Sequence, residues 1–173
     1  MAWTITDPTY DLIPEGYYDA VIIRAGLTYT AGGTEYIAVD LLLENARQTT
    51  LPIWRIKNNP TQADTDLGGW SSRTIMALSK AAGMTAGQTF TGLEDWCKAL
   101  RGKQISIYVA HKTYNGQTRE RVTSTSLSTG KDMTAAIERY RARQTRQPAP
   151  APAPAPAPVP ASFAEVDDDD LPF

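Results

Sequence analysis

The sequence contains one cysteine and one histidine, which excludes most covalent and metal-based scaffolds. A single cysteine cannot form an internal disulfide, and zinc sites need several Cys and His side chains at defined spacings. The chain also lacks a run of about 18 apolar residues, the length that a membrane-spanning helix requires. Its first residues do not show the basic and then apolar pattern of a secretory signal. We therefore expect a soluble, cytoplasmic protein without disulfide, metal or membrane partner.

Side chains suited to catalysis are equally scarce. His111 continues the parity of an apolar strand, and Cys97 lies on an apolar helical stripe. Asp64 and Asp66 stand in a polar segment, where two carboxylates without further ligands make a weak metal site. No glycine-rich phosphate loop with its lysine is present. We therefore expect no enzyme and no cofactor.

The charged residues are divided along the chain. All 17 Lys and Arg residues lie at or before Arg146 with 14 of the 19 acidic residues, which leaves that part at +3. Glu165 and Asp167–Asp170 give the remaining segment −5. The sequence therefore predicts a mildly basic body and an acidic end, which can act on different partners.

A change of composition at Gln147 predicts where the body ends. From Pro148 onward, proline alternates with small residues. Proline fixes φ, lacks an N–H and restricts its predecessor, so this stretch favours an extended polyproline II spacer. The 13 residues from Pro148 to Pro160 would span roughly 40 Å. We predict a folded domain at 1–146, a disordered Pro/Ala-rich linker at 147–164 and an acidic interaction tip at 165–173.

Apolar periodicity predicts three strands in the first part of the body. Residues 16–29 are rich in β-branched and aromatic side chains, and Gly26 indicates a bend or bulge. In residues 34–44, Ile37, Val39 and two leucines share one parity, which predicts a half-buried strand. A third strand is expected from about Gln48 to Lys57.

Helical signals follow this third strand. Residues 58–69 are polar and predict a mobile surface loop. Ser71 or Ser72 can cap a helix that ends near Gly83. Thr91 and Glu94 have the spacing of a capping box for a second helix, which ends at Gly102.

The last part of the body predicts a hairpin and a final helix. Two strands, near 104–109 and 118–127, flank the hairpin signal Asn115-Gly116. A last helix is expected over 134–145. Three strands, a helix and two more strands match the order of a five-stranded OB-fold barrel. We therefore predict a mainly β (α+β) protein with the helix between strands 3 and 4 and an added C-terminal helix. A six-stranded sheet with one covered face is the alternative.

The sequence ends in EVDDDDLPF, in which four carboxylates precede an aliphatic residue, proline and a terminal phenylalanine. This ending resembles the C-terminal tip of bacterial single-stranded DNA-binding proteins, which hangs on a disordered linker. Such a tip suits a receptor with an apolar pocket and a basic rim. The residues that would bind this receptor are Asp167, Asp168, Asp169, Asp170, Leu171, Pro172 and Phe173. The alternative for a charge run is a solubilising tail.

The body is similar to phage-encoded OB-fold single-stranded DNA-binding proteins. The similarity rests on the strand order and on the Pro-Glu-Gly-Tyr opening at 14–17. The Asn-containing first strand of conventional bacterial members is not found. The resemblance implies a location in the cytoplasm of a bacterial host cell.

Binding of unpaired nucleic acid needs positive charge along the phosphates and aromatic faces on which bases stack. The predicted strands and the first loop supply both kinds of side chain. The candidate contacts are Arg24, Tyr29, Tyr36, Trp54, Arg55, Lys57, Tyr108, Lys112, Tyr114, Arg119 and Arg121. The orientation of Trp54 stays open, because Ile53 and Ile56 cannot both point inward without a bulge. Trp70 and Trp96 are assigned to the core.

These observations predict a protein that coats single-stranded DNA during phage replication or recombination. Its tip would recruit host or phage replication and recombination proteins, and a homo-oligomer is compatible with the sequence. The alternative is an adaptor or recombination mediator that carries the tip without coating DNA. A nucleic-acid-processing enzyme would need metal-dependent turnover, for which the sequence gives no reason.

Overall fold

The computed structural model describes residues 11–146, and this part of the chain is mainly β. The tip and the linker, at 147–173, lie outside the described residues. The elements in chain order are β1 (Gly16–Tyr29), β2 (Glu35–Leu43), β3 (Gln48–Trp54), α1 (Gln62–Asp66), α2 (Ser72–Ala81), α3 (Leu93–Leu100), β4 (Gln104–Tyr114), β5 (Gln117–Leu127) and α4 (Thr134–Arg146). The prediction of a mainly β (α+β) protein is therefore confirmed.

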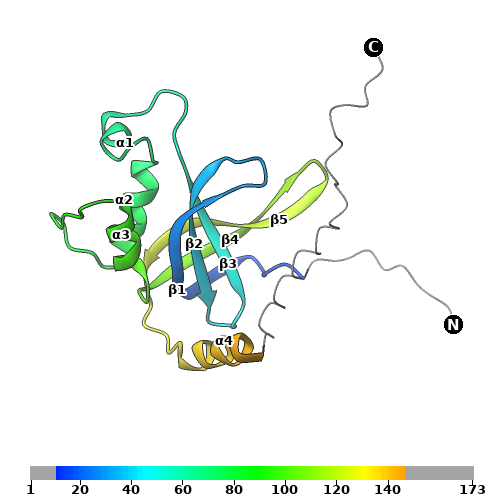
Figure 1. The fold of residues 1–173 in the computed structure, drawn as a ribbon. Coiled ribbons are helices and arrows are strands. Elements are labelled where there is room, and N and C mark those ends of the chain that lie inside the picture. The colour runs from blue at the N-terminus through cyan, green and yellow to red at the C-terminus, as the bar shows by residue number, and fades with distance from the viewer. Residues whose placement is uncertain (1–10, 147–173) are drawn as a thin grey trace, which may run out of the picture.

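The strands form one five-stranded sheet in the order β3-β2-β1-β4-β5, and every neighbouring pair is antiparallel. Five strands rule out the six-stranded alternative for the described residues. The sheet is open, because no ladder among residues 11–146 joins β3 to β5. Figure 1 shows α1–α3 together at the left of the sheet, α4 below it and the β4–β5 hairpin projecting to the right.

A bulge bends β1, but it does not lie at Gly26 as the sequence predicts. Ile22 pairs with Leu41 and Arg24 with Asp40, which leaves Ile23 as the extra residue. Gly26 itself pairs regularly with Ala38. The bulge therefore follows from the pairing with β2, which a glycine signal in β1 alone does not reveal.

The segment after β3 also differs from the prediction. The strand ends at Trp54, and beyond it Arg55 forms an isolated bridge with Trp70. The expected loop contains the short helix α1, and Thr61 and Asp64 form a capping box at its N-terminus. The sequence predicts Asp64 as a loop carboxylate, but the residue is 6% exposed and its carboxylate also accepts a hydrogen bond from the Ser72 N–H.

Helices α2 and α3 lie close to the predicted positions. Ser71 caps α2, and Gly83 follows its end with φ of 70°. The predicted capping box of α3 is wrong, because the N-cap is Gly92 and Thr91 pairs with Asp95 instead of Glu94. Asp95 is one position further into the helix, where its carboxylate reaches both the N–H and the hydroxyl of Thr91.

The main core lies between one face of the sheet and α2 and α3. Alternate β2 residues such as Ile37 and Val39 are fully buried in it, as are Trp70 and Trp96, which confirms their assignment. Cys97 is buried there too, and burial raises the pKa of its thiol. The indole of Trp96 donates to Ser79 Oγ at 2.9 Å, so its polar atom is satisfied inside the core.

A second, smaller core lies under α4 on the opposite face of the sheet. Val21 and Leu42 pack there against Met133 and Ala136 of the helix. This contact explains why β2 is more buried than the half-buried strand that the sequence predicts.

Asp19 ties the segment before α4 to the sheet. Its carboxylate is 2% exposed and accepts hydrogen bonds from the side chains of Gln104, Ser128 and Thr129 and from the N–H groups of Thr129 and Lys131. Burial alone would raise the pKa of Asp19, but these hydrogen bonds outweigh it and lower the pKa to about 2. One buried carboxylate therefore anchors the chain that leads into α4.

The β4–β5 hairpin turns at Asn115-Gly116, as predicted. Both residues have positive φ, 50° and 74°, which a two-residue hairpin turn of this type requires. Within residues 11–146, no helix is long and apolar enough to cross a membrane.

Candidate nucleic-acid interface

Tyr36 and Trp54 form an aromatic pair at the end of the β2–β3 ladder. The two residues are direct partners across the strands, and their ring centroids lie 4.7 Å apart at an angle of 30°. Ile53 is 1% exposed, whereas Trp54 is 40% exposed, which settles the orientation of β3. We call Tyr36 and Trp54 the stacking platform, because a partly open aromatic pair offers a face to a planar ring.

Arg55 fixes the chain next to the stacking platform. Its guanidinium pairs with Glu35 at 2.7 Å, donates to the carbonyl of Gly68 and lies 4.2 Å above the Trp70 ring. These contacts join β2, the end of β3 and the segment before α2. Arg55 is therefore engaged within the protein, and its positive charge is balanced by Glu35.

Three basic residues converge on the gap between β3 and β5. Arg73 of α2, Lys112 of β4 and Arg121 of β5 line a hollow of about 540 Å³, with Pro52 on its β3 side. All three are exposed, and none forms an ion pair within the part of the chain that the structure describes. We call this feature the cationic hollow. Cations that lack a carboxylate partner remain available to an anionic ligand.

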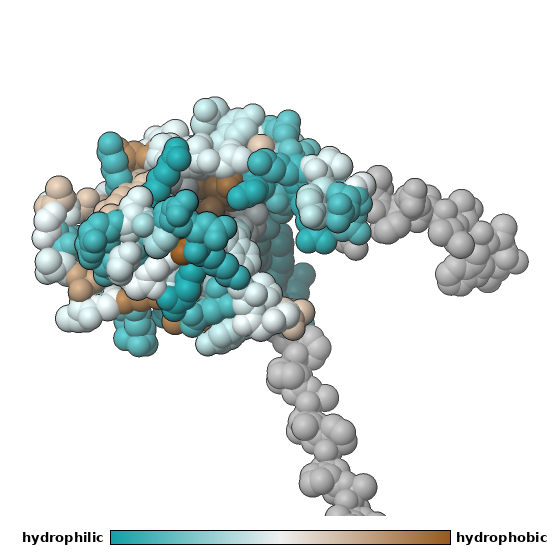
Figure 2. Space-filling view, turned by 90° about the horizontal axis from the view of Figure 1, so that it is seen from above, coloured by the Kyte–Doolittle hydropathy of each residue, from teal (hydrophilic) through white to brown (hydrophobic). Residues whose placement is uncertain are grey.

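The stacking platform and the cationic hollow adjoin. Pro52 lies two residues before Trp54 in β3, and residues two apart in a strand point to the same face. The space-filling view from above shows hydrophilic side chains over the surface with apolar patches between them (Figure 2). The arrangement therefore places aromatic faces beside unpaired positive charge.

The tip of the β4–β5 hairpin adds exposed side chains to the same region of the fold. Tyr114 is 79% exposed, and Arg119 is held by Gln117 at 3.1 Å. Lys112 pairs directly with Arg119 across the hairpin, and Tyr114 lies two residues further along β4, so the three share one face.

Another aromatic pair joins β1 to β4. Tyr17 and Tyr108 are cross-strand partners in edge-to-face contact, with centroids 4.8 Å apart. Tyr17 is 73% exposed, whereas Tyr108 is half-buried. Tyr108 is therefore less open to solvent than Tyr17.

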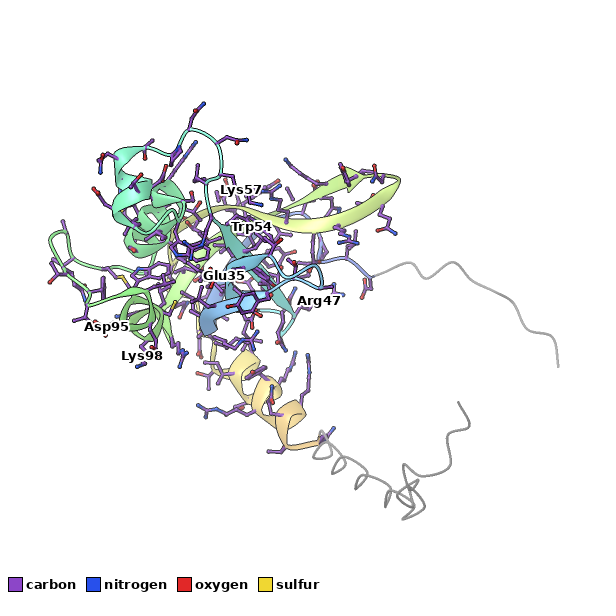
Figure 3. The ribbon with its side chains drawn as sticks, turned by 45° about the horizontal axis from the view of Figure 1, so that its top comes forward. Glu35, Arg47, Trp54, Lys57, Asp95 and Lys98 are labelled. Atoms are coloured by element: carbon purple, nitrogen blue, oxygen red, sulfur yellow. The ribbon has the colours of Figure 1, made fainter. Side chains whose placement is uncertain are left out.

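The remaining predicted contacts lie around the stacking platform or along β1. Lys57 is exposed, and Figure 3 shows it near Trp54 and Glu35, far from Asp95 of α3. The Tyr29 hydroxyl donates to Glu35 at 3.4 Å. Arg24 pairs with Asp40 at 2.7 Å, so its charge is balanced like that of Arg55.

Side chains with catalytic or ligating chemistry have structural partners here. The imidazole Nε2 of His111 lies 2.7 Å from the carbonyl of Ile13, and the backbone N–H of His111 donates to the carboxylate of Glu15. Asp64 serves as a helix cap. Within residues 11–146, no three His, Cys, Asp or Glu side chains come together as a metal site.

Two residues of this surface were not among the sequence-based candidates. Arg73 is off the apolar stripe of α2, and only the packing of α2 against β5 brings it to the cationic hollow. Tyr17 has an aromatic neighbour in Tyr18, so the sequence showed that one points inward but not which. Burial decides it, because Tyr18 packs against the main core whereas Tyr17 is 73% exposed.

The fold defines a mainly β protein with an open antiparallel sheet of five strands and an exposed aromatic and cationic surface. The family model described as "Protein of unknown function (DUF669)" matches residues 6–147, and the chain belongs to this family. No curated protein matches the chain significantly.

Proposed function

We propose that the protein binds single-stranded DNA and coats it during replication or recombination of a bacteriophage. The observation that carries the proposal is the stacking platform beside the cationic hollow. Bases of any sequence can stack on aromatic rings, while unpaired cations follow the phosphates. The path would run from Trp54 past Pro52 to Lys112 and Arg121, with Tyr114 and Arg119 at its edge.

The strand order supports a partly open OB barrel as the architecture behind this function. Cutting a five-stranded OB barrel between its third and fifth strands gives the order β3-β2-β1-β4-β5 found here. The helices α1–α3 lie between β3 and β4, which is where that fold places its helix. In such barrels, strands 2 and 3 and the loops beside them bind oligonucleotides.

The acidic tip at 165–173 supplies the second half of the proposal. Asp167–Asp170 would attract a basic rim over some distance, and Leu171 and Phe173 would offer apolar side chains to a pocket. The tip would recruit replication and recombination proteins of the phage or its host to coated DNA. The cytoplasm of the bacterial host cell is the corresponding location.

Titration of the full-length protein with a fluorescent oligo(dT), repeated at several salt concentrations, tests DNA binding. We expect saturable binding that weakens with salt. Trp54→Ala should lower the affinity by about 1–3 kcal/mol, roughly five- to 150-fold, because it removes one stacking face. Trp54→Phe should retain most of the affinity.

The matched control is Met76→Ala, which truncates a side chain that is 58% exposed on α2. It should leave the affinity unchanged. Equal affinities of Trp54→Ala and wild type would contradict the stacking role. If the protein does not bind oligo(dT) at low salt, the result favours the alternative hypothesis of an adaptor or recombination mediator that does not coat DNA.

A further inference from the structure

A second hollow lies between α4 and the sheet. It has a volume of about 560 Å³, and its apolar lining includes Val21, Ile23, Leu42, Ile137 and Tyr140. Ile23 reaches it because the β1 bulge inserts this residue between Ile22 and Arg24. Ile23, Ile137 and Tyr140 are only half-buried, so α4 leaves part of this apolar surface open. We call it the α4 groove.

The α4 groove is lined by two cations and one carboxylate. Lys131 and Arg141 line it, and Lys131 also pairs with Glu44 at 2.7 Å. Asp132 lies at the rim as well, but its carboxylate is held by the N–H and the hydroxyl of Thr134. Arg141 is exposed and has no ion-pair partner within residues 11–146. The groove therefore combines an apolar floor with a free guanidinium.

The C-terminal tip has the complementary chemistry. Leu171, Pro172 and Phe173 are apolar, and they follow four consecutive aspartates. A receptor for such a segment needs an apolar pocket beside positive charge. The α4 groove offers both within this same chain.

The length of the Pro/Ala-rich spacer bears on whether the α4 groove binds the tip of its own chain or that of a second copy. Arg141 and Arg146, where the described chain ends, are five residues apart in α4, which is only about 8 Å along the helix. The Pro/Ala-rich stretch between Arg146 and the tip would span roughly 40 Å if extended. A spacer much longer than the distance between two sites lowers the effective concentration of one site at the other, which disfavours their contact within one chain.

We infer that the α4 groove binds the acidic tip of a second copy of this chain. Each copy then offers a groove and a tip, so the contact is head-to-tail and can continue from copy to copy. The inference goes beyond DNA binding and does not depend on it. On a shared DNA strand, the nearness of neighbours would raise the effective concentration of each tip.

A labelled peptide of residues 165–173 tests the groove in the absence of DNA. The receptor is the full-length chain carrying Phe173→Ala, which silences its own tip. We expect saturable binding that weakens at least tenfold with Arg141→Glu and with Ile23→Asp. Since Arg141 is exposed, its variant tests the groove without disturbing the core. Lys98→Glu, an exposed site on α3, is the matched control and should change the affinity less than twofold.

Sedimentation velocity tests the role of the second copy. Wild type should associate as its concentration rises, whereas Phe173→Ala should stay monomeric. The inference is overturned if the peptide does not bind, if Arg141→Glu leaves its binding intact, or if Arg73→Glu abolishes it instead. A wild-type chain that remains monomeric at all concentrations also overturns it. A failed oligo(dT) titration contradicts the proposed function alone.

Discussion

Basic residues of similar exposure differ in whether their charge is available. Arg24 and Arg55 are paired with Asp40 and Glu35, whereas Arg73 and Arg121 have no such partner among residues 11–146. A paired guanidinium must give up its carboxylate before it can contact a phosphate with full charge. We therefore expect the unpaired residues to dominate binding of an anionic strand.

Arg73→Ala should weaken oligo(dT) binding and make it less sensitive to salt. Loss of one phosphate contact lowers the slope of log affinity against log salt by about 0.7 for a single strand. Lys80→Ala, an exposed change on the same helix, should leave the slope unchanged and serves as the control. Identical slopes for Arg73→Ala and wild type would remove Arg73 from the interface.

For single residues, the sequence could predict which side chains reach the surface better than it could predict which side chains they contact. Tyr36 has the parity opposite to the buried Ile37, and Tyr114 stands next to the hairpin turn, so both positions indicate contact with the surface, which the structure confirms. Parity could not orient Trp54, because the end of β3 depends on the bridge between Arg55 and Trp70. It also could not show that Glu35 balances Arg55, since the two residues meet only after β2 and β3 have paired.

Among the elements, α4 is preceded by a segment that a buried carboxylate of β1 holds to the sheet. Asp19 holds the segment from Ser128 to Lys131, which precedes the helix. Its lowered pKa means that the folded state binds the proton more weakly than the unfolded state. The corresponding stability is present above the ordinary pKa of 3.8 and is lost as the pH falls through about 2.

Asp19→Asn should lower the free energy of unfolding by about 2 kcal/mol at pH 7, because the shift from 3.8 to about 2 stabilises the fold by that order. Urea unfolding between pH 2 and pH 7 measures the effect. The variant should also lose part of the rise in stability from pH 2 to pH 4, while the rest remains because hydrogen bonds lower the pKa of Asp64 as well. Asp66→Asn, at the end of α1, is the control and should leave that rise in place. An unchanged pH profile in Asp19→Asn would contradict the anchoring role.

The β4–β5 hairpin positions Lys112 and Arg121, and its turn requires a left-handed backbone. Gly116→Ala should destabilise the protein by about 1 kcal/mol, because φ there is 74° and a side chain is strained in that region. Thermal unfolding measures the loss. Gly32→Ala in the β1–β2 turn has no such φ and provides the comparison. Equal effects of the two substitutions would contradict the assigned turn.

Elements with strong local signals were predictable, and elements fixed by contacts were not. The Asn115-Gly116 turn and the Ser71 cap follow from residue chemistry alone. The β1 bulge and the burial of Leu42 follow from pairing with β2 and from α4, and neither leaves a local pattern.

For the whole molecule, the division of charge predicts separate roles for the body and the tip. Replacing Asp167–Asp170 with asparagine removes four negative charges but no described part of the fold. Oligo(dT) affinity should stay the same or rise, because weak competition for the basic surface disappears. Capture of replication proteins on immobilised protein should be lost. A large decrease in DNA affinity would contradict the separation of roles.

The position of the stacking platform on the outer surface has a consequence for the topology of binding. The inner face of the sheet is filled by the main core, so a strand can reach Trp54 only from outside. An outer surface permits sideways access anywhere along a continuous strand, including a circular one. On the proposed function, loading and removal would therefore need neither a nick nor a motor to part the protein.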